Sequence, residues 1–113
     1  MDDAVLEIRF FDLHPGVRAE FDRISREGTI PLMRRCGIDV VAFGPMLNDA
    51  DAWCLLRSFA SEQDRITRSG AMYETEEWLE RFEKVVPPMI AGYRTAVLPT
   101  TTDMVETVRH AHR

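Results

Sequence analysis

The order of strand-like and helix-like patterns is the feature that most restricts the fold of this chain. Residues 5–13 (VLEIRFFDL) alternate and are rich in β-branched and aromatic side chains, which predicts a strand that ends at Pro15 and Gly16. Residues 38–45 (IDVVAFGP) and 52–60 (AWCLLRSFA) predict two more strands, joined by the turn LNDAD as an antiparallel hairpin. Residues 89–98 (MIAGYRTAVL) predict a fourth strand.

The segment between the first two strands has helical spacing. Its apolar or small positions, Val17, Phe21, Ile24 and Gly28, recur at intervals of three and four residues. Pro31 lacks the N–H that an α-helix needs, so it predicts a kink. The apolar phase continues after it to Cys36, and Gly37 is a typical C-terminal cap. We therefore expect one bent helix.

The segment between the third and fourth strands predicts a helix in two pieces. Ser61 and Asp64 resemble a capping box, and the first piece should end near Arg68, before Ser69 and Gly70. Thr75 is placed to cap the second piece. The buried stripe of that piece would consist of Trp78, Phe82 and Val85, and the Pro87–Pro88 pair would end it.

The order is βαββαβ, which predicts a ferredoxin-like α+β fold: an antiparallel four-stranded sheet with two kinked helices on one face. Two helices cover one face only, yet strand alternation makes both faces apolar. The expected faces of the second strand are Ile38, Val40 and Ala42 against Val41 and Phe43; those of the third are Trp53, Leu55 and Phe59 against Cys54 and Leu56. A bare apolar face is unfavourable in water, so we expect a second copy to cover it, giving a homodimer.

The composition restricts the classes of partner that this protein can have. A net charge of −5 without a basic cluster argues against nucleic acid, and no apolar run approaches the roughly 18 residues of a membrane span. The expected location is the cytoplasm, and Cys36 and Cys54 are expected to be free and buried. No phosphate-binding glycine loop or Cys/His metal set occurs in the sequence, and His14 lies in a turn, so neither a metal nor another cofactor such as haem is expected.

Four segments in order resemble the NIPSNAP family of the dimeric α/β-barrel superfamily. These are EIRFFDLHPG, GTIPLMRRCG with the strand after it, LLRSFASEQDR, and MYETEEW, and the likeness covers about residues 5–98. Phe11 and Cys36 depart from it, because the family usually has Tyr and often His there. The resemblance implies a homodimeric domain over residues 1–99 and no assigned activity. Residues 100–113 would be a tail, either a short helix, docked on the partner copy, or disordered.

Glu7 and Arg9 are two charged residues on one face of an apolar strand, and two explanations stay open. In the first they are structural, with Glu7 paired to Arg9, Arg57 or Arg94 across strands. In the second they line a pocket for an apolar molecule that carries a carboxylate or a carbonyl. By analogy with the superfamily, that pocket would lie between sheet and helices and would be lined by Glu7, Arg9, Arg57, Phe59, Tyr73 and Trp78.

Three functions follow as alternatives. The first is binding of a small organic molecule. The second is a cofactor-independent monooxygenase or isomerase, as in related superfamily members, for which Glu7 is the weak candidate base and Tyr73 a candidate donor. The third is a scaffold dimer without catalysis.

Overall fold

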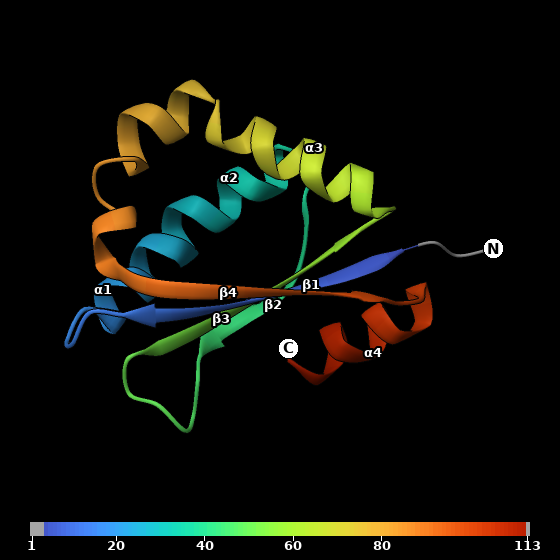
Figure 1. Cartoon of the computed structure of the whole chain (residues 1–113), viewed down its shortest axis with the longest axis horizontal. Helices are drawn as coiled ribbons and strands as arrows, with labels where there is room; N and C mark the ends of the chain where they lie inside the picture. Colours follow the sequence, from blue (N-terminus) through green and yellow to red (C-terminus); the bar gives the residue numbers. More distant parts are fainter. Residues whose placement is uncertain (1–3, 113) are drawn as a thin grey trace.

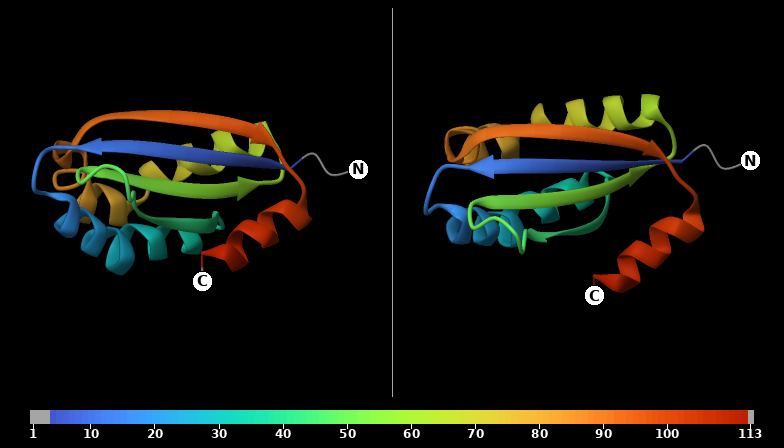
Figure 2. Two further views of the ribbon diagram at one scale, coloured as in Figure 1. Left: turned by 90° about the horizontal axis from the view of Figure 1, so that it is seen from below. Right: turned by 60° about the horizontal axis from the view of Figure 1, so that its bottom comes forward.

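A computed structural model describes residues 4–112 and contains one four-stranded antiparallel sheet. The strands lie in the order β2-β3-β1-β4, with both central strands flanked on each side (Figure 2). Their bounds are β1 Val5–Leu13, β2 Asp39–Pro45, β3 Ala52–Phe59 and β4 Ile90–Pro99. The predicted βαββαβ order and the hairpin between β2 and β3 are confirmed.

The first helical segment runs without interruption from residue 18 to residue 35 and covers one face of the sheet (Figure 1). It consists of α1 (Arg18–Ile24), one π-helical turn η1 (Ser25–Thr29), and α2 (Ile30–Arg35). The irregularity thus lies immediately before Pro31, because proline cannot continue the hydrogen bonds of the preceding turn. Gly37 ends the segment with φ of +80°, a conformation that glycine adopts without strain.

The second helical segment begins with α3 (Glu62–Tyr73), which lies on the same side of the sheet. The N–H of Asp64 donates to Ser61 Oγ at 3.0 Å, and the Asp64 carboxylate accepts the N–H of Ala60 at 3.1 Å. The predicted break at Ser69–Gly70 is wrong. A helical glycine costs only about 1 kcal/mol, and the helix gains more by burying Met72, which is 0% exposed.

A second π-helical turn, η2 (Trp78–Phe82), follows α3, and a short 3-10 turn η3 (Pro87–Met89) leads into β4. Thr75 caps this piece as predicted, because its Oγ1 accepts the N–H of Trp78 at 3.2 Å. The predicted stripe is correct for Trp78 and Phe82 but wrong for Val85, which is 46% exposed. A π turn contains one extra residue, so the buried position moves to Val86.

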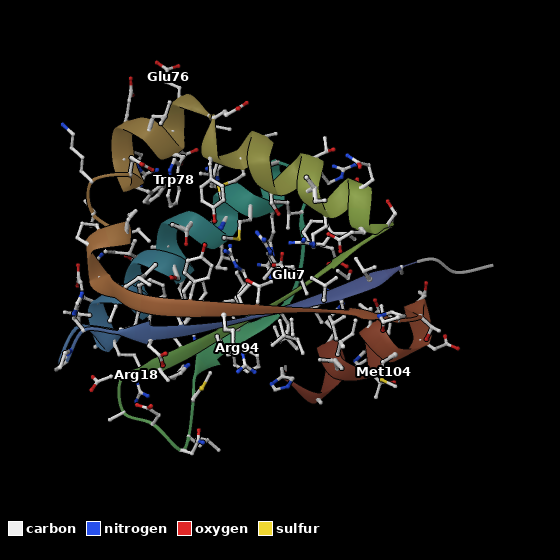
Figure 3. The ribbon with its side chains drawn as sticks, viewed as in Figure 1. Glu7, Arg18, Glu76, Trp78, Arg94 and Met104 are labelled. Atoms are coloured by element: carbon white, nitrogen blue, oxygen red, sulfur yellow. The ribbon has the colours of Figure 1, made fainter. Side chains whose placement is uncertain are left out.

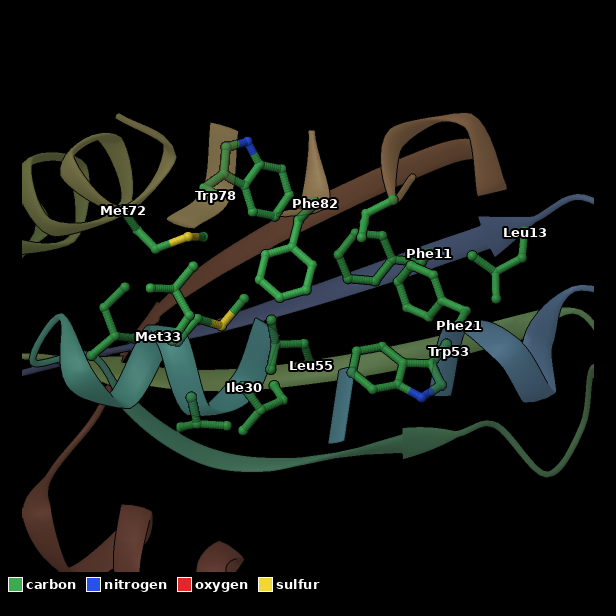
Figure 4. Packing of buried hydrophobic residues seen from close by; sticks show 14 of the residues in the cluster. Phe11, Leu13, Phe21, Ile30, Met33, Trp53, Leu55, Met72, Trp78 and Phe82 are labelled. Carbon is green, nitrogen blue, oxygen red and sulfur yellow. The ribbon is translucent and has the colours of Figure 1, made fainter. Parts of the chain in front are cut away.

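The main core lies between the sheet and these two helical segments, and it contains Phe11, Phe21, Trp53 and Leu55 (Figure 4). The alternation predicted for β1 and β3 is confirmed. In β2 the register shifts between Val40 and Ala42, which is a β-bulge. Ala42 therefore pairs with outward-facing Leu56, and Phe43 packs on Trp53 in the core with ring centroids 5.8 Å apart. The sequence predicted Ala42 on the same face as Val40 and Phe43 on the same face as Val41. The bulge makes this prediction wrong for both Ala42 and Phe43.

The tail forms helix α4 (Thr102–Ala111), which lies on the other face of the sheet. Thr101 Oγ1 caps it by accepting the N–H of Met104 at 3.1 Å, and Val105 packs on Leu6 and Val41. Arg109 Nη2 donates to Asp39 Oδ2 at 2.8 Å and fixes the helix to β2. Within residues 4–112, no helix has the length and apolarity needed to cross a bilayer.

The two helical segments come into close contact at Gly28 and Phe82. A Cβ placed on Gly28 would lie 2.6 Å from Phe82 Cζ, and Phe82 is buried. Gly28 belongs to η1 and Phe82 to η2, so this contact joins the two π turns above the sheet.

The contact at Gly28 leads to a testable difference between two helical glycines. Gly28→Ala should destabilise the protein by roughly 1–3 kcal/mol, because the buried Phe82 ring must move. Gly70→Ala is the matched control: a Cβ there meets nothing within 4 Å, so the helix should gain roughly 0.5–1 kcal/mol. Urea denaturation measures both. Equal stability of the two variants would contradict the close packing.

Candidate functional site

A cavity of about 430 Å³ lies between the sheet and the two helical segments. Side chains from β1, β3, β4, η1 and the region around η2 line it. Six of its lining residues are aromatic: Phe11, Phe21, Trp53, Tyr73, Trp78 and Tyr93. Several of them appear together in Figure 4. The volume falls in the range of small-molecule sites, and the walls are mostly apolar.

Arg9 brings a positive charge to this apolar cavity. Its guanidinium carbon lies 5.1 Å from the ring centroid of Tyr93 and 5.6 Å from that of Phe11, so the cation rests on aromatic faces. Arg9 Nη1 donates to the Tyr73 hydroxyl at 3.1 Å. Arg9 Nε is buried and has no hydrogen-bond partner, and no carboxylate among residues 4–112 lies within 4.0 Å of the side chain. Arg9 therefore has unused donor capacity.

Tyr73 and Trp78 form the helical wall next to Arg9. Their rings meet edge to face with centroids 4.8 Å apart. The Tyr73 oxygen accepts from Arg9, which leaves the Tyr73 proton free to donate to a bound molecule. Trp78 Nε1 donates to the Glu83 carboxylate, and that bond holds the indole in place. The arrangement suits an anionic or carbonyl oxygen near Arg9 and Tyr73.

Glu7 and Arg57 form a buried ion pair beside the cavity. Arg57 Nε donates to Glu7 Oε1 at 2.7 Å, and the two side chains are 0% and 1% exposed. Arg65 of α3 donates to the other Glu7 oxygen at 3.0 Å, and Arg57 Nη2 donates to Ser69 Oγ at 3.0 Å. Figure 3 shows Glu7 pointing from β1 toward the helices. The network therefore fastens α3 to the two central strands.

The arginines keep Glu7 ionised. Burial by itself would raise the pKa of Glu7, but the hydrogen bond and charge of Arg57, the hydrogen bond from Arg65 and the charge of Arg9 outweigh it and hold the pKa below its ordinary value of 4.5. A carboxylate with a lowered pKa is a weak proton acceptor near neutral pH. Glu7 thus has the chemistry of a structural anion.

The predicted site residues divide into two groups. Arg9, Tyr73 and Trp78 line the cavity. Glu7, Arg57 and Phe59 are not among its lining residues, and the Arg57 guanidinium lies against the Phe59 ring at 5.4 Å. Glu7, whose pairing was left open between Arg9, Arg57 and Arg94, pairs with Arg57 and with a residue that sequence reasoning missed, Arg65.

Sequence reasoning missed several other lining residues. Tyr93 follows the inward parity of β4, which alternation alone would have identified. Ser25 and Thr29 are polar residues that line the cavity from the π turn η1, and a regular helical periodicity does not single them out. Arg94 lies on the opposite side of the sheet from Glu7 (Figure 3).

Replacing Glu7 tests its structural role. Glu7→Gln should destabilise the protein by roughly 3–5 kcal/mol at neutral pH, because Arg57 is then buried without its counter-charge. The Glu7 pKa is lowered in the folded state, so the stabilisation is present above pH 4.5 and is lost as the pH falls further. As the pH is lowered from neutral to 3, urea denaturation should therefore show the free energy of unfolding of the wild type approaching that of Glu7→Gln.

Glu20→Gln is the matched control for this substitution. Glu20 also pairs with an arginine, Arg23, but both side chains are more than half exposed. Its loss should change stability little. A Glu7→Gln protein as stable as the Glu20→Gln protein would refute the structural role.

Comparison with known proteins finds similar folds among solved structures. No protein-family model matches the sequence, and no curated protein does either. Among solved structures, a NIPSNAP-like domain protein from Burkholderia xenovorans is 18% identical, with a TM-score of 0.81 over 90% of this chain and 89% of that one. A NIPSNAP family protein from Agrobacterium tumefaciens is also 18% identical, with a TM-score of 0.81 over 90% of each chain.

A more distant neighbour extends the likeness. A putative antibiotic biosynthesis monooxygenase from Nitrosomonas europaea is 14% identical, with a TM-score of 0.67 over 88% of this chain and 92% of that one. At sequence identities this low, the similarity concerns the fold and not the function. The strand order, the two helical segments on one face and the extent of the overlap confirm the resemblance seen in the sequence. This chain therefore has the ferredoxin-like α+β fold of the NIPSNAP structures to which it is similar.

Proposed function

We propose that this protein binds a small, largely apolar molecule, aromatic in part, that carries a carboxylate or a carbonyl group. The observation that carries the proposal is Arg9: a cation in an aromatic cavity with a buried, unpartnered Nε. A buried N–H of a charged group is unfavourable when it has no hydrogen-bond partner, so an acceptor oxygen at Arg9 Nε would be stabilising. A ligand oxygen near Arg9 and Tyr73 would supply that partner, while the aromatic walls hold the rest of the molecule.

The surroundings of Arg9 favour an anionic group there, although the cavity is also lined by the Glu83 carboxylate, which accepts from Trp78 Nε1. Of the arginines on this side of the sheet, Arg57 and Arg65 already share Glu7, whereas Arg9 has no carboxylate within 4.0 Å among the described residues. Arginine binds carboxylates through two parallel N–H groups, so it selects the orientation of the ligand as well as its charge.

The proposed location of this binding is the cytoplasm. The free thiols of Cys36 and Cys54 are consistent with its reducing conditions.

Catalysis is the second candidate function, because neighbours of the same fold bear the name of putative antibiotic biosynthesis monooxygenases. For this chain the candidate donor beside Arg9 is the Tyr73 hydroxyl, which accepts from Arg9 Nη1 and lines the cavity. Glu7, the base considered from the sequence, is buried in its ion pair and does not line the cavity. Mass spectrometry of ligand recovered after incubation distinguishes the candidates: a binding protein returns it unchanged, and a monooxygenase adds oxygen to it.

Calorimetric titration with cinnamate tests the binding site. Cinnamate is an aromatic carboxylate, and cinnamamide is its uncharged analogue. The wild type should bind cinnamate, and cinnamamide roughly tenfold or more weakly, because a charged hydrogen bond is worth about 1.5–3 kcal/mol. Arg9→Met should remove this preference while keeping the apolar volume of the side chain.

Arg94→Met is the control for that substitution, since Arg94 lies on the other face of the sheet. It should bind cinnamate as the wild type does. If Arg9→Met and Arg94→Met bound cinnamate equally, Arg9 would not be the anion-binding residue. Failure of the wild type to bind either compound would contradict the proposed function.

We also propose that the chain functions as a homodimer. On the outer face of the sheet, α4 covers Leu6 and Val41, but Leu98 remains 49% exposed and Phe10 is only half-buried. A second copy placed on this face would remove the remaining apolar surface from water. An interface of this kind repeats the same patch on both copies around a two-fold axis.

Sedimentation velocity tests the dimer. The wild type should sediment as a species with twice the chain mass of 13.0 kDa. Phe10→Glu should shift it to a single chain, because a charge would be buried in the interface. Leu47→Glu is the control at a fully exposed loop position and should leave the dimer intact. A wild-type protein that sediments as one chain would refute the proposal.

A further inference from the structure

Two buried hydroxyl groups form a second polar position in the cavity, opposite Arg9. Ser25 and Thr29 belong to the π turn η1 and are 3% and 5% exposed. Both line the cavity from its helical wall, whereas Arg9 lines it from strand β1 of the sheet. A molecule that fills the space between sheet and helices would therefore meet a cation on one side and hydroxyl groups on the other.

The Thr29 hydroxyl has no hydrogen-bond partner among residues 4–112. A helical threonine commonly donates to the carbonyl four residues earlier, which here is that of Ser25. In this π turn the Ser25 carbonyl accepts the N–H of Ile30 instead, and Thr29 forms no such bond. Its oxygen is not among the fully enclosed unpaired atoms, so the small exposed fraction of Thr29 includes the hydroxyl.

The Ser25 hydroxyl complements that of Thr29. Ser25 Oγ donates to the carbonyl of Phe21 at 2.8 Å, which fixes its proton within the helix. Its oxygen keeps acceptor capacity toward the cavity. Thr29 can donate as well as accept, so the pair can accept a hydrogen bond from a ligand hydroxyl and donate one to its oxygen.

We propose that the ligand carries a hydroxyl group that binds Ser25 and Thr29, in addition to the anionic group that binds Arg9. The ligand class is then a hydroxylated aromatic carboxylate, with its two polar groups at opposite ends of an apolar body. This inference rests on the proposed function and narrows it. A hydroxyl that has no partner within the described residues and is accessible in a cavity can both donate to and accept from a ligand hydroxyl.

The test compares cinnamate with its three hydroxylated isomers, the ortho-, meta- and para-coumarates, by calorimetric titration. At least one coumarate should bind the wild type roughly threefold to tenfold more tightly than cinnamate, the gain of one added hydrogen bond. Thr29→Val removes the hydroxyl at nearly constant volume and should abolish this gain without weakening cinnamate. Thr107→Val is the control, because the Thr107 hydroxyl lies on α4 and donates to the Asp103 carbonyl.

The ligand-free protein gives an independent measurement. Thr29→Val should not lower the melting temperature, because the hydroxyl it removes makes no bond in the folded chain. A clear fall in melting temperature would reveal a structural partner and overturn the proposal. So would binding of cinnamate with no coumarate preferred, or a preference that Thr29→Val leaves intact; the proposed function would survive both results. If neither cinnamate nor any coumarate bound the wild type, the proposed function would fall together with this inference.

Discussion

The buried ion pair between Glu7 and Arg57 is the interaction on which the arrangement of the other elements depends. It joins the two central strands of the sheet, and Arg65 and Ser69 extend it to α3. Removing two charges from water is unfavourable unless each finds partners, so the network holds only in the geometry that brings all four residues together. That geometry sets the position of α3, and therefore of Tyr73 at its end.

The two π turns explain how a cavity arises beside so compact a core. Each π turn widens its helix by one residue, and both η1 and η2 line the cavity. They meet through Gly28 and Phe82, where the missing side chain of glycine permits a close approach. The cavity thus lies where both helices depart from regular geometry, and departures of this kind are frequent at functional sites.

Periodic patterns predicted most of the fold. The four strands and the single helical segment between the first two followed from alternation, helical spacing and turn residues. The errors have local physical causes. Tertiary burial of Met72 outweighed the weak preference of Gly70 against helix, a bulge at Val41 exchanged the faces of Ala42 and Phe43, and a π turn moved the buried position from Val85 to Val86. The bulge and the π turn each insert one residue into the regular period, which a periodic pattern cannot reveal.

The sequence by itself determined the order of the elements, the apolar character of both sheet faces and the presence of two charges, Glu7 and Arg9, on one side of the first strand. Only the tertiary structure decided that these neighbours have different roles. Glu7 lies opposite Arg57 across the central strands and within reach of α3, so its charge is neutralised inside the core. Arg9, one step along the same face, reaches aromatic rings and a hydroxyl but no carboxylate among the described residues. Strand alternation fixes a shared face, whereas partners depend on segments far away in the chain.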